Sequence, residues 1–368
     1  MNQKFSYIFY RTTAEAWDAM YQAILMAHDS ILWEMYTFID DAAGKKFMDI
    51  FCDKAAKGVR VIVIVDAIGS RELSSAAVDR LKRNGVVVML FNNPMRFGRS
   101  WREWLKRIWH RSHRKVLVVD NKIAFVGGVN VRYEMTEWDD LHVRLTGRIV
   151  RQLSYRFARD FVRLGGDKML IKRWLRPKRD FFEKLKEKVK FLMHQPVVLG
   201  HHSAVRSLYH QALSVAKESF TLVTPYYAPG MDFLRLIQEA NKRGVKVNII
   251  APLRPDVWLM KWLGQIFLEA SVRAGATVYL LPHMNHAKAL QVDSKWGMIG
   301  SANLTPRSFF HNRESSVVFE EEKMVEELNG IMADWQKQAQ ILEKFKAENP
   351  GILKRLKYRL ADFLRDYV

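Results

Sequence analysis

The chain has 368 residues, 49% of them hydrophobic and 12% aromatic, a composition that describes a folded protein and excludes a disordered or collagen-like chain. Its length suggests two domains or two fused halves. A formal net charge of +20 predicts an anionic partner, either nucleic acid or a negatively charged membrane surface, unless the charge serves solubility alone.

The N-terminus and the cysteine content bear on where the protein works. Residues 1–20 lack the basic and apolar regions of a signal peptide, and no run of 18 or more apolar residues occurs. Cys52 is the only cysteine, which excludes a disulfide framework and a multi-cysteine metal site and favours a reducing compartment. Together with the charge, these features predict a cytoplasmic protein bound peripherally to the inner face of a membrane.

The chain consists of two copies of one unit. Segments that begin at Ala23 and surround Gly58 and Gly85 recur 189, 186 and 190 residues later. Each unit alternates helices with strands such as the apolar run 59–65, which predicts an α/β fold whose mostly parallel sheet is covered by helices on both faces. The boundaries predicted from this repeat are 1–166 for the first unit, 167–198 for a basic amphipathic linker, and 199–368 for the second unit with a basic amphipathic tail.

Three short segments, residues 94–112, 167–190 and 351–368, hold +14 of the net charge of +20. The first interleaves tryptophans with cations, a pattern typical of an interfacial membrane helix, although a helix packed on the core is the alternative. Core packing is favoured for 351–368, and both a lipid-contacting patch and a solvated linker helix stay open for 167–190. The predicted membrane-binding residues are Trp101, Trp104, Trp109, Arg102, Lys106 and Arg107.

A six-residue pattern occurs twice with identical spacing, which chance rarely produces. It places His, Lys, Asp, Gly, a Gly or Ser, and Asn at relative positions 0, 2, 7, 14, 15 and 17. His and Lys stand two apart at the start of a strand, so their side chains project from one face. The Asp is predicted to serve structure, because its distance along the strand carries it away from them. The two copies are His113, Lys115, Asp120, Gly127, Gly128 and Asn130, and His286, Lys288, Asp293, Gly300, Ser301 and Asn303.

Brought face to face, the two copies offer two imidazoles, two ammonium groups and two amides, a set suited to attack at phosphorus without a metal or other cofactor. One His acts as nucleophile, the other protonates the leaving alkoxide, and the lysines and asparagines stabilise charge on the phosphoryl oxygens. Gly128 and Ser301 are expected to let backbone amides approach the phosphate. The motif does not decide which His is phosphorylated; we favour His113.

A nucleophilic His needs a carboxylate that holds its tautomer and stabilises the imidazolium. In the first half the candidate is Asp140, 27 residues after His113, with Asp139 as the competing choice. In the second half the candidate is Glu314, 28 residues after His286. Each candidate is therefore expected to orient the His of its own half.

The duplicated pattern H-x-K-x(4)-D-x(6)-G-[GS]-x-N resembles that of the phospholipase D superfamily over roughly residues 12–320. The stretches HMNHAKALQVD, TPYYAP, IGSANLTPRSFFHNRES and RSHRKVLVVDNKIAFVGGVN are similar to its cardiolipin synthase branch. The resemblance implies two α/β/α units related by a pseudo-twofold axis, with one active site at their junction. It also implies phosphatidyl transfer through a phosphohistidine, which joins two phosphatidylglycerols into cardiolipin and releases glycerol.

The resemblance further implies a phospholipid substrate and an anionic membrane surface as partners, with no nucleic acid and no need of an oligomer for the site. A phospholipase D-type hydrolase, or a phosphodiesterase or nuclease, is the alternative within the same chemistry. A non-catalytic membrane-binding protein with a relict site is disfavoured because both motif copies are complete. Many cardiolipin synthases carry N-terminal membrane spans that this sequence lacks. The sequence between Asn303 and Glu314 also differs from the usual sequence of the branch, so the preference for a lipid head group stays open.

Overall fold

The computed structural model describes residues 4–93, 101, 104, 108–175, 188–195 and 203–342. The chain divides into two compact units. Unit 1 comprises Met1–Met193 and Arg313–Val317, and unit 2 comprises His194–Asn312 and Val318–Val368. A short piece of the second sequence repeat therefore belongs to the first unit.

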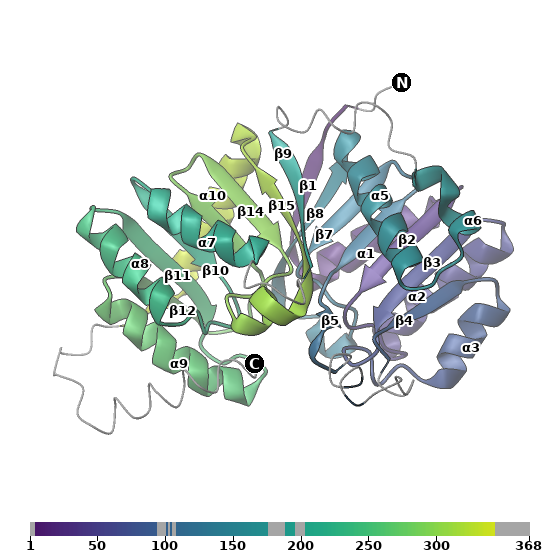
Figure 1. Cartoon of the computed structure of the whole chain (residues 1–368), viewed down its shortest axis with the longest axis horizontal. Coiled ribbons are helices and arrows are strands. Elements are labelled where there is room, and N and C mark those ends of the chain that lie inside the picture. Colours follow the sequence, from purple (N-terminus) through teal and green to yellow (C-terminus); the bar gives the residue numbers. More distant parts are fainter. Residues whose placement is uncertain are drawn as a thin grey trace. The chain divides into compact units, whose positions relative to one another are not determined.

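A seven-stranded sheet forms the middle of unit 1, with the strand order β1-β8-β7-β6-β2-β3-β4 (Figure 1). Strands β2, β3 and β4 run parallel, whereas β6, β7, β8 and β1 each run antiparallel to their neighbours. The strands are β1 Tyr7–Thr12, β2 Ser30–Met35, β3 Arg60–Asp66, β4 Val87–Phe91, β6 Val116–Val119, β7 Ile123–Gly127 and β8 Asp139–Thr146, with a two-residue strand, β5 Arg111–Ser112, before β6.

Helices cover both faces of this sheet. Three helices pack on the face that carries Ile31, Trp33 and Met35 of β2, and α5 packs on strands β2, β6, β7 and β8 with its buried side chains. The Trp33 ring lies 5.0 Å from that of Phe47 and 4.9 Å from that of Phe51, which joins α2 to the sheet. The helices are α1 Thr13–Leu25, α2 Ala42–Ala56, α3 Ser75–Arg83 and α5 Arg148–Arg163.

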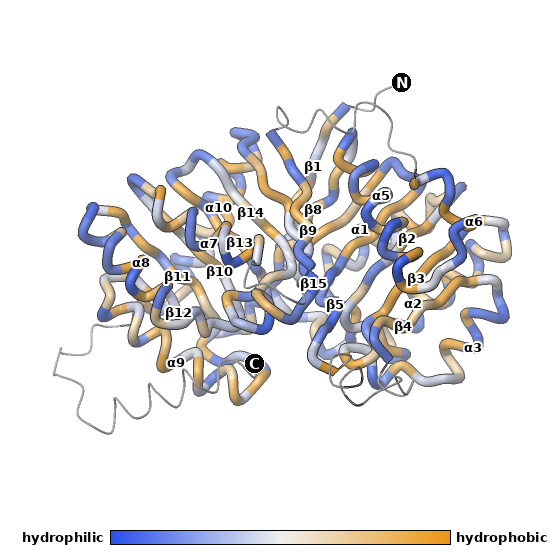
Figure 2. Tube along the Cα trace, viewed as in Figure 1, coloured by the Kyte–Doolittle hydropathy of each residue, from blue (hydrophilic) through white to orange (hydrophobic). Residues whose placement is uncertain are grey.

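Unit 2 repeats this arrangement with the strand order β16-β12-β11-β10-β13-β14. Helices α8 and α9 pack on β11 and β12, and α10 packs on β12, β13 and β14. Figure 2 shows the hydrophobic colour concentrated on the central strands of each unit. The elements are α7 Ala204–Val215, β10 Ser219–Val223, α8 Met231–Lys242, β11 Lys246–Pro252, α9 Trp258–Arg273, β12 Thr277–Leu281, β13 Ala289–Val292, β14 Trp296–Gly300, α10 Glu322–Gln338 and β16 Gln340–Ile341.

The α/β fold and the internal repeat are confirmed, but the expectation of mostly parallel sheets is wrong. In both units three parallel strands continue into an antiparallel hairpin, β6-β7 in unit 1 and β13-β14 in unit 2. The hairpin turns are Asp120–Asn121, with φ of 52° and 54°, and Asp293–Ser294, with φ of 53° and 50°. Each connection has three residues, 120–122 and 293–295, and positive φ at its first two positions suits a tight reversal between antiparallel strands.

The motif aspartates tie each hairpin to the first strand of its parallel set. Each carboxylate accepts hydrogen bonds from three consecutive backbone N–H groups. Asp120 accepts from His28, Asp29 and Ser30, and Asp293 accepts from Lys217, Glu218 and Ser219. Each aspartate thus fixes the hairpin strand that follows its His and Lys, a role in structure rather than in chemistry.

Part of the predicted linker is folded onto unit 1. Residues 168–174 form α6 (Lys168–Ile171) and η2 (Lys172–Trp174), and the Trp174 side chain is buried. The Arg173 guanidinium donates to the Asp29 carboxylate and stacks on the Trp174 ring, 4.1 Å from its centre. A later part of the linker forms strand β9 (Val189–His194), which pairs with β15 (Asn312–Phe319). Residues 176–187 and 196–202 lie outside the described part of the chain.

Candidate active site

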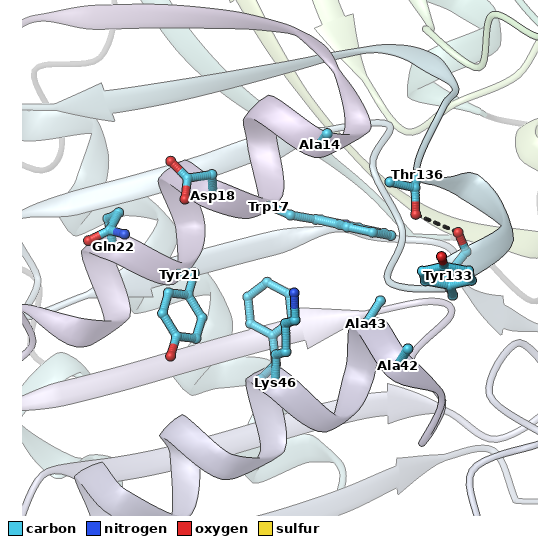
Figure 3. Close-up of a pocket in the computed structure, with 11 residues that line it drawn as sticks. Ala14, Trp17, Asp18, Tyr21, Gln22, Ala42, Ala43, Lys46, Tyr133 and Thr136 are labelled. Atoms are coloured by element: carbon cyan, nitrogen blue, oxygen red, sulfur yellow. Dashed lines mark hydrogen bonds between the residues drawn. The ribbon is translucent and has the colours of Figure 1, made fainter.

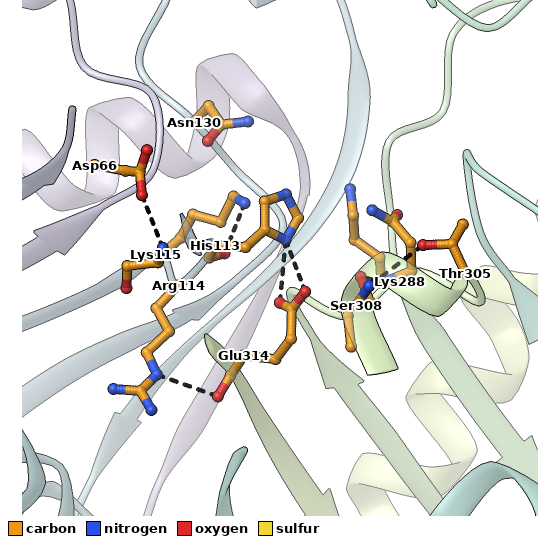
Figure 4. Close-up of polar contacts among 12 residues, drawn as sticks. Asp66, His113, Arg114, Lys115, Asn130, Lys288, Thr305, Ser308 and Glu314 are labelled. Atoms are coloured by element: carbon orange, nitrogen blue, oxygen red, sulfur yellow. Dashed lines mark hydrogen bonds and ion pairs between the residues drawn. The ribbon is translucent and has the colours of Figure 1, made fainter. Parts of the chain in front are cut away.

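The buried pair His113 and Glu314 forms the centre of the site in unit 1. Residues 313–317 of β15 lie in this unit, where β15 pairs with β5, and the His113 amide donates to the Arg313 carbonyl at 2.9 Å. The His113 Nδ1 atom lies 3.0 and 3.2 Å from the two carboxylate oxygens of Glu314 (Figure 4). When Nδ1–H donates to this carboxylate, Nε2 carries the lone pair that a nucleophilic or basic imidazole needs.

The expectation that Glu314 orients His286, the His of its own sequence repeat, is wrong. Glu314 is fully buried, and both oxygens of its carboxylate contact His113 of the other repeat. The cause is the path of β15, which leaves its own repeat and pairs with the strand that directly precedes His113. Spacing along one repeat cannot reveal such an exchange, because it records only distances within the chain.

The two motif lysines have the same local geometry. Lys115 is fully buried, and its Nζ donates to the carbonyl oxygen of His113 at 2.8 Å. Lys288 is likewise buried, and its Nζ donates to the carbonyl oxygen of His286. Each ammonium group is therefore held beside the backbone of the His two residues before it.

Two tyrosines that the sequence analysis missed flank the histidines. The Tyr36 ring stands edge-on to the His113 imidazole at 4.7 Å between centres, and the Lys115 Nζ lies 4.9 Å from the centre of the same ring. Tyr226 stands edge-on to His286 in the same way at 6.1 Å. Each tyrosine follows the first strand of its parallel set, Tyr36 after β2 and Tyr226 after β10. An alignment of the two sequence repeats could have revealed this shared position.

The motif asparagines are buried and held in place by neighbouring groups. The Thr37 amide donates to Asn130 Oδ1 at 3.3 Å, which sets the side-chain NH2 group as the end that can donate to a ligand. The Trp17 indole N–H donates to the Asn130 backbone carbonyl at 2.7 Å. In unit 2 the Asn303 amide donates to Ser308 Oγ at 3.1 Å. These contacts fix the backbone around both asparagines.

The Gly128 amide is engaged within the chain, because its N–H donates to the Leu141 carbonyl at 3.1 Å. Contact between a phosphate and the backbone at this position stays a prediction. A Cβ atom at this position would lie 2.1 Å from a carboxylate oxygen of Asp140, so the glycine leaves room for that buried acid. Ser301, its counterpart in unit 2, is fully buried.

His142 is a buried histidine of β8 that makes the stability of the fold depend on pH. It is buried, the Val129 amide approaches its Nδ1 at 3.4 Å, and burial lowers the pKa of His142 to about 4 despite the opposing effect of Asp140. The folded state thus binds fewer protons than the unfolded state between pH 4 and pH 6.5, and the free energy of unfolding falls as pH falls through this window.

We expect the free energy of unfolding to be about 3 kcal/mol lower at pH 4 than at pH 7, because a shift of one pKa unit corresponds to about 1.4 kcal/mol. Urea unfolding at pH 4.5 to 7 measures it, with His142→Gln as the comparison. The slope of stability against pH should be smaller in the variant, and equal slopes in both proteins would contradict this assignment.

A buried network of charges holds the Glu314 segment in unit 1. The Arg114 guanidinium lies 2.5 Å from the Asp160 carboxylate and 3.6 Å from that of Glu34, and Arg313 contacts the same two acids. Arg114 Nε also donates to the Glu314 carbonyl at 3.2 Å. The charges of the two guanidinium groups and the two carboxylates cancel. The network holds Arg114, which follows His113, and Arg313, which precedes Glu314.

Removing Asp160 is expected to lower the free energy of unfolding by about 3 to 5 kcal/mol, because Asp160→Ala leaves two buried guanidinium groups with one carboxylate. Guanidinium chloride unfolding measures this loss. Asp53→Ala is the matched control, because Asp53 pairs with Lys57 on the exposed surface of α2 and such pairs contribute at most about 0.5 kcal/mol. Similar losses in the two variants would contradict a buried network.

A groove of about 590 Å³ lies in unit 1 between α1, α2 and the turn η1 (Tyr133–Met135) (Figure 3). Its volume falls within the range of small-molecule pockets. Trp17 joins the groove to the site, because its ring lines the groove while its N–H holds the Asn130 carbonyl. The lining residues are Ala14, Trp17, Asp18, Tyr21, Gln22, Ala42, Ala43, Lys46, Phe47, Tyr133 and Thr136.

The predicted membrane-binding segment is described only in part. Trp101 is 67% exposed and Trp104 is 38% exposed, whereas Trp109 is half-buried. Arg102, Lys106 and Arg107 lie outside the described residues, as does the tail 351–368. In the part of the chain that the structure describes, no helix has the length and hydropathy needed to span a bilayer. No group of three or more His, Cys, Asp or Glu side chains suited to a metal ion occurs among these same residues.

Known proteins resemble the chain in sequence and in fold. It is 29% identical to a cardiolipin synthase of Geobacillus thermodenitrificans and 32% identical to cardiolipin synthase A of Pseudomonas syringae, in each case over 82% of this chain and over 60% and 62% of the relative. The chain thus spans about 60% of the length of these relatives. A phosphatidylserine synthase of Haemophilus influenzae has the same fold, with a TM-score of 0.72 and 13% identity over 98% of this chain and 95% of that one.

The two motif copies and the repeated strand order fall within the regions that a family of known proteins shares. Residues 20–163 and 209–335 match the family described as the phospholipase D-like domain of cardiolipin synthase. These ranges include both histidines, both lysines, both asparagines and Glu314. The chain therefore belongs to the phospholipase D-like family of cardiolipin synthases.

Proposed function

We propose that the protein is a phosphatidyltransferase that forms cardiolipin from two molecules of phosphatidylglycerol. The observation that carries the proposal is the buried contact of Glu314 with His113, beside the Lys115 ammonium, within a motif that unit 2 repeats. This arrangement supplies an oriented imidazole and a positive charge for a phosphodiester. The names of the curated relatives support a phospholipid as the substrate.

In the proposed reaction, Nε2 of His113 attacks the phosphorus of phosphatidylglycerol, and the bond from phosphorus to the glycerol oxygen breaks. His286 gives its proton to that oxygen, so glycerol leaves neutral. A hydroxyl of a second phosphatidylglycerol then loses its proton to His286 and attacks the phosphohistidine, which releases cardiolipin and restores both histidines. The lysines and asparagines of the two motif copies hold the phosphoryl oxygens throughout.

We further propose that the protein works at the inner face of an anionic membrane, to which it binds peripherally, and that its site needs no oligomer. The net charge of +20 and the exposed Trp101 and Trp104 support this location. Hydrolysis of a phospholipid or of DNA by the same residues is the competing reaction, since water can replace the second alcohol.

Incubation with phosphatidylglycerol vesicles, with and without EDTA, tests the proposal. We expect cardiolipin and glycerol in equal amounts at the same rate in both samples, because the proposed steps use only side chains. Phosphatidic acid in place of cardiolipin would establish a hydrolase, and cleavage of single- or double-stranded DNA in a parallel sample would establish a nuclease. Absence of product from lipid and DNA would contradict catalysis by this site.

A further inference from the structure

An exposed apolar surface lies at the start of α9 in unit 2. Trp258 is 77% exposed, more than any other large apolar side chain among the described residues, and Leu253 and Val257 beside it in sequence are 41% and 38% exposed. The cations Arg254 and Lys261 are also exposed. We call these five residues the α9 surface.

Packing of α9 within its own unit does not account for this exposure. The face of α9 that packs inward carries Met260, Leu263 and Phe267, all of which are buried. Trp258 continues instead into a half-exposed stripe with Trp262 and Ile266, four and eight residues further along the helix. A helix whose outer face combines tryptophan, aliphatic residues and lysine has the composition of a segment that lies at a bilayer interface.

The α9 surface lies at the edge of the sheet that carries the motif of unit 2. Strands β10, β11 and β12 run parallel, and the surface begins directly after the carboxyl end of β11. Val223, the last residue of β10, pairs with Ala289, the first residue of the antiparallel β13. His286 precedes Ala289 by three residues, so it lies at the same edge of this sheet as the α9 surface.

One side chain connects the surface with the motif. The Tyr226 hydroxyl donates to the Asp256 carboxylate at 2.6 Å, within the loop that carries the α9 surface, and the Tyr226 ring stands edge-on to His286. The only acid of residues 253–262 is thereby engaged by a hydrogen bond, while its two cations face solvent. The loop that leads to Trp258 is thus linked to His286 through the Tyr226 side chain.

A pocket of about 200 Å³ adjoins the surface and adds apolar volume. Leu253 and Lys261 of the surface line it, together with side chains from the carboxyl ends of β11 and β12 and from α9. Most of these side chains are apolar, such as Met260 and Leu268. Methylene groups of a lipid could enter there from the interface.

We propose that the α9 surface docks on an anionic phospholipid bilayer, with Trp258 inserted at the interface and Arg254 and Lys261 against the lipid phosphates. The charge of this surface is complementary to such a membrane, and its position brings the membrane to the sheet edge that carries His286. The inference extends the proposed function, on which it rests for the identity of the substrate.

The test measures binding to phosphatidylglycerol vesicles by co-sedimentation for the full chain and three variants. Trp258→Ser is expected to weaken binding about tenfold or more, since it removes a large apolar side chain from the interface. Lys261→Gln is expected to weaken it about fivefold. Val215→Ser is the matched control, because Val215 is 56% exposed at the end of α7, which precedes β10 and so lies at the opposite edge of the sheet. Val215→Ser should leave vesicle binding unchanged.

Hydrolysis of bis(p-nitrophenyl) phosphate, a soluble phosphodiester, should stay the same in all four proteins, which verifies the fold and the site. The proposal is overturned if Trp258→Ser and Val215→Ser bind alike, or if the unaltered protein binds phosphatidylcholine vesicles as tightly as phosphatidylglycerol vesicles. If Trp258→Ser loses binding while the unaltered protein makes no cardiolipin, the docking surface is supported and the proposed reaction fails.

Discussion

His113→Asn and His286→Asn are each expected to lower kcat for phosphatidyl transfer by about 10⁴-fold or more, because each removes an imidazole that the proposed steps require. The double variant should be no slower than either single variant, since groups that act as one unit have strongly non-additive effects. Two independent sites, by contrast, would leave about half of the activity in each single variant.

The measurement is the rate of cardiolipin formation from phosphatidylglycerol that carries radioactive phosphorus in its phosphate group. Labelled protein that loses its phosphate in acid should be trapped from one single variant and not the other, which identifies the nucleophile. His283→Asn is the control, because His283 is exposed and stands only three residues before His286 in the sequence. Loss of activity in this control would mean that substitutions in this loop act through folding.

The second large effect is expected at Glu314. Glu314→Gln keeps the size of the side chain but removes the charge that faces Nδ1 of His113, so kcat should fall by about 10² to 10⁴-fold with a smaller change in KM. Asp140 occupies the corresponding place in the first repeat, and Asp140→Asn should have an effect of the same order. Asp139→Asn, at the competing position, should retain most of the activity.

The pH profile of kcat separates a catalytic effect of Glu314 from a structural one. A carboxylate beside Nδ1 stabilises the imidazolium, so its removal should displace the limb of the profile that reports this His, while a merely loosened fold would scale the whole profile. Urea unfolding of Glu314→Gln provides the check on stability. An unchanged kcat in a folded variant would refute the role of Glu314 as the partner of His113.

The sequence by itself determined the α/β class, the duplication and the identity of the motif residues. Each of these is written in local order along the chain: apolar runs of strand length, a constant offset near 190 residues, and the fixed spacing from His113 to Asn130. The hairpin was also readable in principle, because Asp-Asn and Asp-Ser pairs favour turns, but the apolar strands around them favoured a parallel sheet.

Only the tertiary structure decided the partner of His113, the engaged amide of Gly128 and the exposure of Trp258. Each depends on a contact with another element of the fold. β15 pairs with β5 about 200 residues before it, the Gly128 amide donates to Leu141 of β8, and α9 turns its other face to the sheet. Periodicity and spacing describe how a segment can fold, whereas the neighbour it acquires follows from packing, which no single segment records.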